Sequence, residues 1–234
     1  MDKIILYNYF RSSTSFRVRI ALELKQLAYE YRPIHLLNNG GEQHSPEYRK
    51  INAMGGVPTL VHKTSTHTLS IGQSMAILEY LDEAFPQSYQ LFPKHPYQKA
   101  LIKQFCENIN ADIHPYGNLR TLQYLEKNLH ADESAKNQWV QHWISIGLTA
   151  CETMIQEHLR ETTAKGPFCF GDTLTAADVL LIPQIFTAKR FNVSLEKFPT
   201  LINIFNHCSL TEAFKKAHPM RQIDTPEELK IKDS

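Results

Sequence analysis

Long apolar runs are missing from this 234-residue chain, and so is an excess of charge of either sign. No stretch approaches the roughly 18 consecutive apolar residues of a membrane-spanning helix. The apolar run after Met1-Asp2-Lys3 is too short for the core of a secretion signal. The 25 lysine and arginine residues nearly balance the 24 aspartate and glutamate residues, so no overall field favours nucleic acid or an anionic membrane. We therefore expect a cytoplasmic protein that binds neither nucleic acid nor membrane and recognises anions only locally.

Cysteine is scarce and scattered. The four cysteines form no CxxC pair, so they predict reduced, buried thiols and argue against a disulfide framework or a dithiol redox site: Cys106, Cys151, Cys169 and Cys208. The eleven histidines form no HExxH or HxH cluster, which argues against a metal site. A P-loop and a GxGxxG motif after a strand are missing too. These absences direct attention to chemistry that needs neither metal nor nucleotide.

The first third of the chain alternates strand and helix patterns. Runs rich in β-branched and aromatic residues predict strands at 3–7, 29–36, 59–62 and 68–71, and apolar residues at helical spacing predict helices at 13–25 and 74–84. A short helical or irregular link is expected near 45–51. This order, βαβ followed by ββα, predicts one α/β domain.

Only helical patterns follow a proline-rich segment. Three prolines punctuate residues 85–96, which is typical of a linker between domains. Apolar spacing near 3.6 residues then predicts helical regions at 97–129, 133–162, 175–189 and 200–217, and Thr175 and Asp178 have the spacing of a capping box. We expect an α/β domain over 1–86, a linker over 87–95, an all-helical domain over 96–221 and an extended or frayed tail over 222–234.

Hydroxyl side chains crowd the start of the first expected helix, at residues 12–15. Free backbone N–H groups and the positive end of the helix dipole meet at such a point. One hydroxyl could simply cap the helix. Alternatively, one hydroxyl could donate to an anion, most usefully a thiolate. A charge-assisted hydrogen bond contributes about 1.5–3 kcal/mol and a helix end about 0.3–1 kcal/mol. Together these nearly suffice to lower the pKa of a thiol by about two units.

Residues 11–25, RSSTSFRVRIALELK, resemble the SSCxxRVRIAL signature of zeta-class glutathione transferases. The resemblance continues in order through NGGEQ at 39–43, NAMGGVPTL at 52–60, IGQSMAILEYL at 71–81, DIHPYGNL at 112–119, GDTLTAAD at 171–178 and QIDTP at 222–226. Each short match is a weak signal, but the ordered set is specific and covers nearly the whole chain. It implies a thioredoxin-like, glutathione-binding domain followed by an all-helical domain that completes the substrate site, usually in a homodimer.

The resemblance also assigns roles to single positions. Ser12 matches the catalytic serine that donates to the glutathione sulfur, with Ser13 and Thr14 beside it. Glutathione is the implied cofactor, and its implied contacts are Ser12, Gln43, Val57 before a cis Pro58, Gln73, Ser74, His114 and Asn118. Of these, Gln73 and Ser74 match the pair that holds the γ-glutamyl end, and the family more often has glutamine at the position of His114.

The reaction that the resemblance implies is glutathione-dependent cis/trans isomerisation of maleylacetoacetate to fumarylacetoacetate, in the degradation of tyrosine and phenylalanine. Such a substrate is a dianionic enedione, and Arg11 and Arg190 are our candidates for binding its carboxylates. The further candidates are Arg17, Arg19 and Arg120.

One departure from the signature leaves the substrate open. Thr14 stands where the family commonly has cysteine, and similar bacterial isomerases that act on maleylpyruvate, in the gentisate pathway, also carry threonine there. A maleylpyruvate isomerase is therefore the first alternative, and a general glutathione transferase the second. The third is a noncatalytic protein of the same fold that serves in interactions; it would be expected to lack the hydroxyl at the helix start or the Gln73–Ser74 pair.

Overall fold

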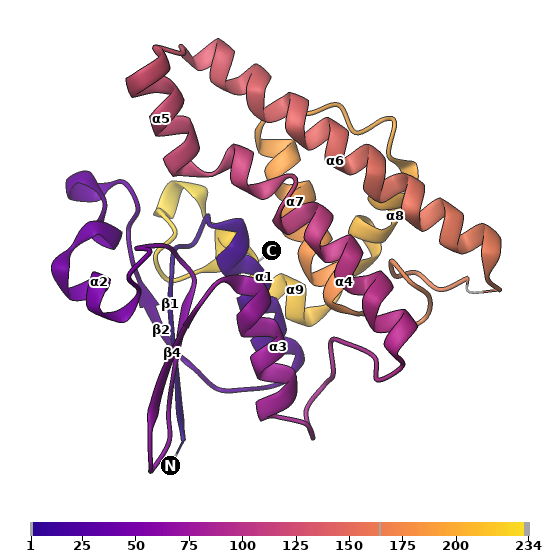
Figure 1. Ribbon diagram of the computed structural model, residues 1–234, viewed down its shortest axis with the longest axis horizontal. Coiled ribbons are helices and arrows are strands. Elements are labelled where there is room, and N and C mark those ends of the chain that lie inside the picture. The colour runs from indigo at the N-terminus through magenta and orange to yellow at the C-terminus, as the bar shows by residue number, and fades with distance from the viewer. Residues whose placement is uncertain (1, 164, 232–234) are drawn as a thin grey trace. The chain divides into compact units, whose positions relative to one another are not determined.

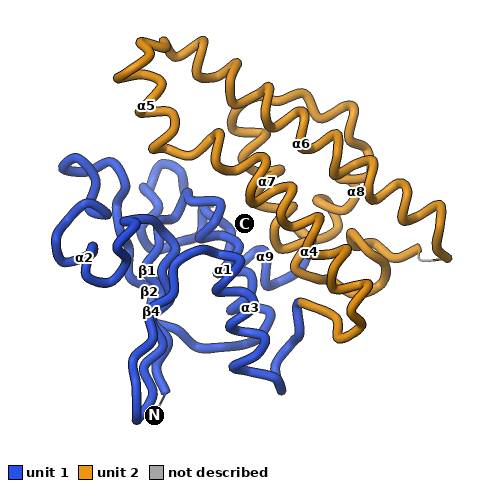
Figure 2. Tube along the Cα trace, viewed as in Figure 1, with its two compact units in different colours: residues 1–91, 211–234 blue, residues 92–210 orange. Residues whose placement is uncertain are grey.

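The computed structural model describes residues 2–163 and 165–231, which form two compact units (Figures 1 and 2). Unit 1 is built from residues 1–91 and 211–234, and unit 2 from residues 92–210. The division between Leu91 and Phe92 falls inside the segment 87–95 that the sequence suggests as a linker.

A four-stranded sheet organises unit 1. Its strands are β1 (Lys3–Asn8), β2 (Glu30–Pro33), β3 (Thr59–Lys63) and β4 (Thr68–Gly72), in the spatial order β2-β1-β3-β4. β1 pairs in parallel with β2 and antiparallel with β3, which in turn pairs antiparallel with β4. β2 is shorter than the predicted strand at 29–36 because its partner β1 ends at Asn8, whose carbonyl accepts a last hydrogen bond from Ile34 N–H at 2.8 Å.

Helices cover both faces of this sheet. α1 (Ser13–Leu24) and α3 (Ser74–Ala84) lie on one face, and α2 (Pro46–Ile51) lies on the other, after the short 3₁₀ turns η1 (Asn38–Gly40) and η2 (Glu42–His44) (Figure 1). The predicted α/β domain is thus present. Lys25, just after α1, and Asp82 of α3 form an ion pair at 2.6 Å with both side chains buried. The Asp82 carboxylate also accepts a hydrogen bond from Leu91 N–H at 2.9 Å, which fixes the end of this part of the chain.

Unit 2 is all helical, as predicted. Its elements are α4 (Pro96–Asn110), η3 (His114–Gly117), α5 (Leu119–Leu129), α6 (Glu133–Glu161), α7 (Ala176–Arg190) and α8 (Pro199–Cys208). α7 is the most buried of these helices and packs against α4 and α8. The predicted helical region 97–129 is interrupted after Asn110, because Pro115 lacks an N–H donor and Asn118 begins a new helix by capping α5.

The predicted capping box at the start of α7 is confirmed. Asp178 is fully buried, and its carboxylate accepts hydrogen bonds from the backbone N–H groups of Thr175 and Cys169, each at 2.8 Å. The Thr175 hydroxyl adds a third bond at 3.2 Å. Because every one of these donors is itself buried, the carboxylate holds the preceding loop and the helix start together.

The C-terminal residues differ from the prediction. Residues 211–221 were expected to close the helical domain and residues 222–234 to form a frayed tail, yet the described residues from 211 to 231 belong to unit 1. α9 (Glu212–Ala217) packs on α1 and buries Phe214, and the 3₁₀ turns η4 (Pro219–Arg221) and η5 (Glu227–Leu229) follow it. The Gln222 side chain donates to the carbonyl groups of Lys216 and His218 at 2.8 Å. Helical spacing identifies such a helix but carries no information about the unit it packs on, which explains the error.

All four cysteines are free and buried, as predicted. Burial raises the pKa of Cys151 to about 12, and burial together with the neighbouring Asp178 carboxylate raises the pKa of Cys169 well above its usual value. No helix among residues 2–163 and 165–231 combines the length and the apolar character that crossing a membrane requires.

Candidate functional site

The loop between β1 and α1 ends at Ser12, which caps α1. Its backbone is extended, and its hydroxyl oxygen accepts a hydrogen bond from Ser15 N–H at 3.2 Å. Ser13, the first residue of the helix, is buried. No acidic side chain lies in the first turn of α1, so the positive end of this twelve-residue helix is not neutralised from within the helix. The capping role and the anion-binding role are therefore compatible at Ser12.

A chain of hydrogen bonds connects Ser12 to a distant loop. The Thr14 hydroxyl donates to the Val57 carbonyl oxygen at 3.1 Å, and it lies 3.0 Å from the Ser12 hydroxyl. A hydroxyl has one proton to donate, and the carbonyl can only accept. With the Thr14 proton committed to Val57, Ser12 must be the donor in the bond between the two hydroxyls. In this structure the Ser12 proton is thus directed to the Thr14 hydroxyl, and Ser12 can donate to a ligand only by turning that proton away from Thr14.

Side chains of Tyr48 and Asn52 fix the segment that contains Val57. The peptide bond between Val57 and Pro58 is cis, as the resemblance implied. The Gly56 carbonyl accepts hydrogen bonds from the Tyr48 hydroxyl at 2.6 Å and from the Asn52 side-chain amide at 3.0 Å. Burial raises the pKa of Tyr48 to about 12, so its hydroxyl stays protonated and remains a donor at neutral pH.

The start of α3 is a second site suited to an anion. Ser74 is 2 % exposed, and its hydroxyl oxygen accepts a hydrogen bond from the fully buried Arg17 guanidinium at 3.1 Å. Gln73, just before it, has φ of 67°, a region that costs a non-glycine residue on the order of 1–3 kcal/mol. A buried cation behind a helix start and a strained residue in front of it together favour recognition of a carboxylate.

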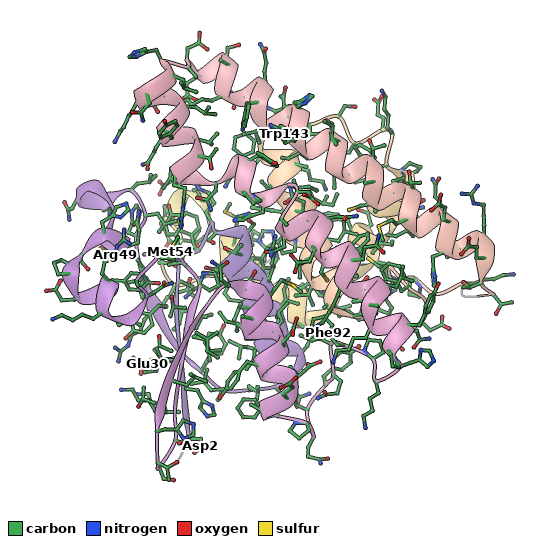
Figure 3. All side chains as sticks on the ribbon, in the orientation of Figure 1. Asp2, Glu30, Arg49, Met54, Phe92 and Trp143 are labelled. Carbon is green, nitrogen blue, oxygen red and sulfur yellow. The ribbon has the colours of Figure 1, made fainter. Side chains whose placement is uncertain are left out.

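Gln43 supplies an unsatisfied polar atom in the same unit. Its side chain is 5 % exposed, its amide nitrogen donates to the Leu36 carbonyl at 3.3 Å, and its amide oxygen has no hydrogen-bond partner among the described residues. A buried acceptor without a donor is costly unless a ligand supplies one. Gln43 belongs to the part of unit 1 around α2, where Figure 3 labels Arg49 and Met54.

His114 and Asn118 lie in unit 2, at η3 and the start of α5. The Asn118 side-chain oxygen caps α5 by accepting from Arg120 N–H at 3.1 Å, and its amide nitrogen lies 3.4 Å from His114 Nε2. Aromatic side chains surround this turn. The Tyr116 ring stacks on the ring of Trp143 in α6, at 4.1 Å between ring centroids.

The candidate arginines separate into exposed and buried groups. Arg11 is half-buried, with its guanidinium 5.9 Å from the centre of the Phe10 ring, and Arg190 is exposed at the end of α7. Arg17 and Arg19, proposed from the sequence as further carboxylate-binding residues, are fully buried in unit 1. That interpretation is wrong for both, since their guanidinium groups are engaged inside the unit by Ser74 and by loop carbonyl groups.

Unit 1 joins Ser12, Thr14 and Val57 through hydrogen bonds, and it holds Gln43, Pro58, Gln73 and Ser74 as well. The residues expected from the second domain lie in unit 2: His114, Asn118 and Arg190. Sequence reasoning missed Arg17 as the partner of Ser74. The only available signal was its place inside the RVRIAL stretch, because a charged residue is normally expected on the surface. Among the described residues, no group of three His, Cys, Asp or Glu side chains is arranged to hold a metal ion.

The sheet order β2-β1-β3-β4, the cis Val57–Pro58 bond and a separate all-helical unit define the glutathione S-transferase architecture. Residues 11–84 match the family described as "Glutathione S-transferase, N-terminal domain". A probable maleylacetoacetate isomerase of Vibrio cholerae is 42% identical over 96% of this chain and 99% of its own length.

Solved structures agree with these sequence comparisons. A bacterial zeta-class maleyl pyruvate isomerase in its holo form has a TM-score of 0.86 and 37% identity, covering 95% of this chain and 100% of its own. A maleylacetoacetate isomerase from Anaeromyxobacter dehalogenans with glutathione in its active site has a TM-score of 0.84 and 36% identity, covering 96% of this chain and 99% of its own. The chain belongs to the family of zeta-class glutathione S-transferases and maleylacetoacetate isomerases, which confirms the resemblance seen in the sequence.

Proposed function

We propose that this chain is a glutathione-dependent isomerase that converts maleylacetoacetate to fumarylacetoacetate, in the degradation of tyrosine and phenylalanine. The observation that carries the proposal is the Ser12 hydroxyl, which caps the positive end of α1, a helix with no acidic side chain in its first turn. Relatives named for this reaction cover almost the whole chain, which supports the same conclusion.

The residues of unit 1 suit glutathione in three places. The start of α3, with Ser74 in front of the buried Arg17, suits the carboxylate of the γ-glutamyl end. The backbone of Val57 is fixed by Thr14 and suits pairing with the central residue of the tripeptide. The buried, unpartnered oxygen of Gln43 offers an acceptor to an N–H of the ligand. On these grounds we assign glutathione as the cofactor.

The protein's part in the reaction is to favour the thiolate and to orient the substrate. Bound glutathione would supply a thiolate that adds to the cis double bond, permits rotation and leaves unchanged. In the complex the Ser12 hydroxyl would turn from Thr14 to donate a hydrogen bond to the sulfur, and the N–H groups at the start of α1 would add to this stabilisation. Thr14 would hold the Val57 carbonyl and accept from Ser12 when no ligand is bound, and Ser13 would complete the first turn. Arg11 and Arg190 remain our candidates for the two substrate carboxylates.

Maleylpyruvate is the second candidate substrate. Thr14 favours it, because similar isomerases for maleylpyruvate carry threonine at this position, and a maleyl pyruvate isomerase is among the solved relatives. Both substrates are enediones with two carboxylates, so the same residues would act on either. We expect a homodimer in the cytoplasm, as the family resemblance implies, and sedimentation at several protein concentrations tests the dimer.

The proposal is tested by an absorbance assay on both substrates, with and without glutathione. We expect glutathione-dependent loss of the cis isomer for at least one substrate, with higher kcat/KM for maleylacetoacetate. A higher kcat/KM for maleylpyruvate would replace the first substrate by the second. Turnover of neither substrate, with glutathione bound, would refute the isomerase proposal and leave a transferase or a noncatalytic binding protein.

A further inference from the structure

The peptide groups just before Ser12 are held by opposite charges on their two sides. Phe10 N–H donates to a carboxylate oxygen of Asp224 at 2.9 Å, and the Phe10 carbonyl accepts from the Arg19 guanidinium at 2.9 Å. Hydrogen bonds to charged groups are about twice as strong as those between neutral groups. The backbone of Phe10, two places before Ser12, is therefore fixed by these bonds in addition to the burial of its side chain.

Arg19 is the buried centre of this arrangement. Its guanidinium donates to the Asn8 side chain at 2.9 Å and to the Tyr9 carbonyl at 3.4 Å, and its Nε donates to the Ala217 carbonyl at 3.0 Å. Burial lowers the pKa of Arg19, while the nearby Tyr31 and Asp224 act in the opposite direction. The carbonyl groups around it belong to two segments of the chain, so the arginine ties the C-terminal residues to the loop.

Asp224 makes the reciprocal connection from the C-terminal side. Besides Phe10 N–H, its carboxylate accepts a hydrogen bond from the Tyr31 hydroxyl of β2. Burial raises the pKa of Tyr31, and the bond to Asp224 raises it further, so the tyrosine is a protonated donor. Thr225, which is buried next to Asp224, donates to the Pro219 carbonyl and fixes the turn that carries the aspartate.

We propose that residues 217–225, the C-terminal clasp, position Ser12 for thiolate binding, and that Asp224 is the positioning residue on which this depends. Ser12 N–H itself donates to the Tyr9 carbonyl at 3.0 Å, so a shift at Tyr9 or Phe10 is passed directly to Ser12. This inference rests on the proposed function, because it names a residue that supports the same thiolate.

The clasp acts on the sulfur end of the ligand alone. Val57 and Ser74 are held by Thr14 and Arg17, and neither of these bonds involves residues 217–225. Loss of the Asp224 carboxylate should therefore weaken thiolate stabilisation and leave the affinity for glutathione nearly unchanged. A contribution to folding alone would produce the opposite result, with lower stability and a normal thiol.

The experiment compares Asp224→Ala, Asp224→Asn and Tyr31→Phe with Glu228→Gln, a control that neutralises an exposed carboxylate of η5. Three quantities are measured for each: amide exchange of residues 8–12, the pKa of the bound glutathione thiol from thiolate absorbance, and kcat and KM. For Asp224→Ala we expect faster exchange at Phe10, a thiol pKa higher by about one unit and a kcat lower by about tenfold. The asparagine and phenylalanine variants, which keep part of the network, should show smaller changes in the same direction, and the control should show none.

Each possible result either supports or contradicts the positioning role of Asp224. Unchanged exchange in the loop, or faster exchange with an unchanged thiol pKa, would overturn the positioning role. If Asp224→Ala does not fold, the same comparison is made with Tyr31→Phe, which retains the carboxylate. If the wild-type protein isomerises neither substrate while the exchange rate and thiol pKa shift as expected, the proposed reaction fails and the clasp stands.

Discussion

Replacing Ser12 by alanine is the most direct test of how the chain would favour a thiolate. The change removes a hydroxyl that both caps α1 and would donate to the sulfur. A hydrogen bond to a charged group contributes about 1.5–3 kcal/mol, and one pKa unit corresponds to about 1.36 kcal/mol. We therefore expect the pKa of the bound glutathione thiol to rise by about one to two units. Thr14 does not replace the lost donor, because its proton is committed to Val57.

The capping role predicts a different result, which makes the two contributions separable. Loss of the bond from Ser15 N–H should lower the free energy of unfolding by about 1 kcal/mol. Asp132→Ala is a suitable control, because the Asp132 carboxylate caps α6 by accepting from Ala135 N–H at 2.8 Å in unit 2. That variant should lose similar stability while the thiol keeps its wild-type pKa.

The assay is a pH titration of thiolate absorbance in the glutathione complex, combined with the pH profile of kcat. For Ser12→Ala, the isomerase rate at neutral pH should fall by about 10- to 100-fold wherever the thiol pKa exceeds the assay pH, and should recover at higher pH. A thiol that titrates at the same pH in Ser12→Ala and wild type would refute the donor role, even if the variant is less stable.

Three further predictions concern other parts of the chain. Ser74→Ala should weaken glutathione binding by about tenfold with little change in kcat, because it removes the hydroxyl between Arg17 and the expected carboxylate; an unchanged dissociation constant by calorimetry contradicts this. Burial and the nearby Arg19 lower the pKa of His218 from 6.5 to about 4, so between these pH values the unfolded chain binds more protons than the folded chain. The free energy of unfolding should therefore fall as pH decreases from about 6.5 to about 4. The fall should be smaller in His218→Gln. Gly147→Ala should lower the free energy of unfolding by about 1–3 kcal/mol, because a Cβ there would lie 2.1 Å from Ile113 Cγ1; a melting temperature equal to wild type contradicts the packing argument.

The sequence predicts the elements of this fold well because their signals are local. The hydroxyl cluster at 12–15 marks the start of α1, and the Thr175–Asp178 spacing marks the start of α7. Both depend on groups within four residues of one another. The family and its glutathione cofactor could be predicted for a different reason, because the ordered motifs of the family span nearly the whole chain.

The parts that escaped prediction depend on residues far apart in the sequence. The direction of the Ser12 proton is set by Val57, and Asp224 finds its donors at Phe10 and Tyr31, near the opposite end of the chain. Arg19 was a further candidate for binding a substrate carboxylate, but backbone carbonyl groups accept its hydrogen bonds inside unit 1. Every residue has a backbone carbonyl group, so residue types alone cannot predict which carbonyl groups will accept hydrogen bonds from Arg19.

The burial of the cysteines affects how the protein's own thiols react in the presence of glutathione. Cys106, Cys151, Cys169 and Cys208 are the chain's own sulfhydryl groups, and each is enclosed by packing. Since it is the thiolate that exchanges with disulfides, a buried thiol with a raised pKa reacts slowly with oxidised glutathione. We therefore expect the protein to resist glutathionylation in a mixture of reduced and oxidised glutathione, and the proposed donor Ser12 would act only on a sulfur that enters from solution.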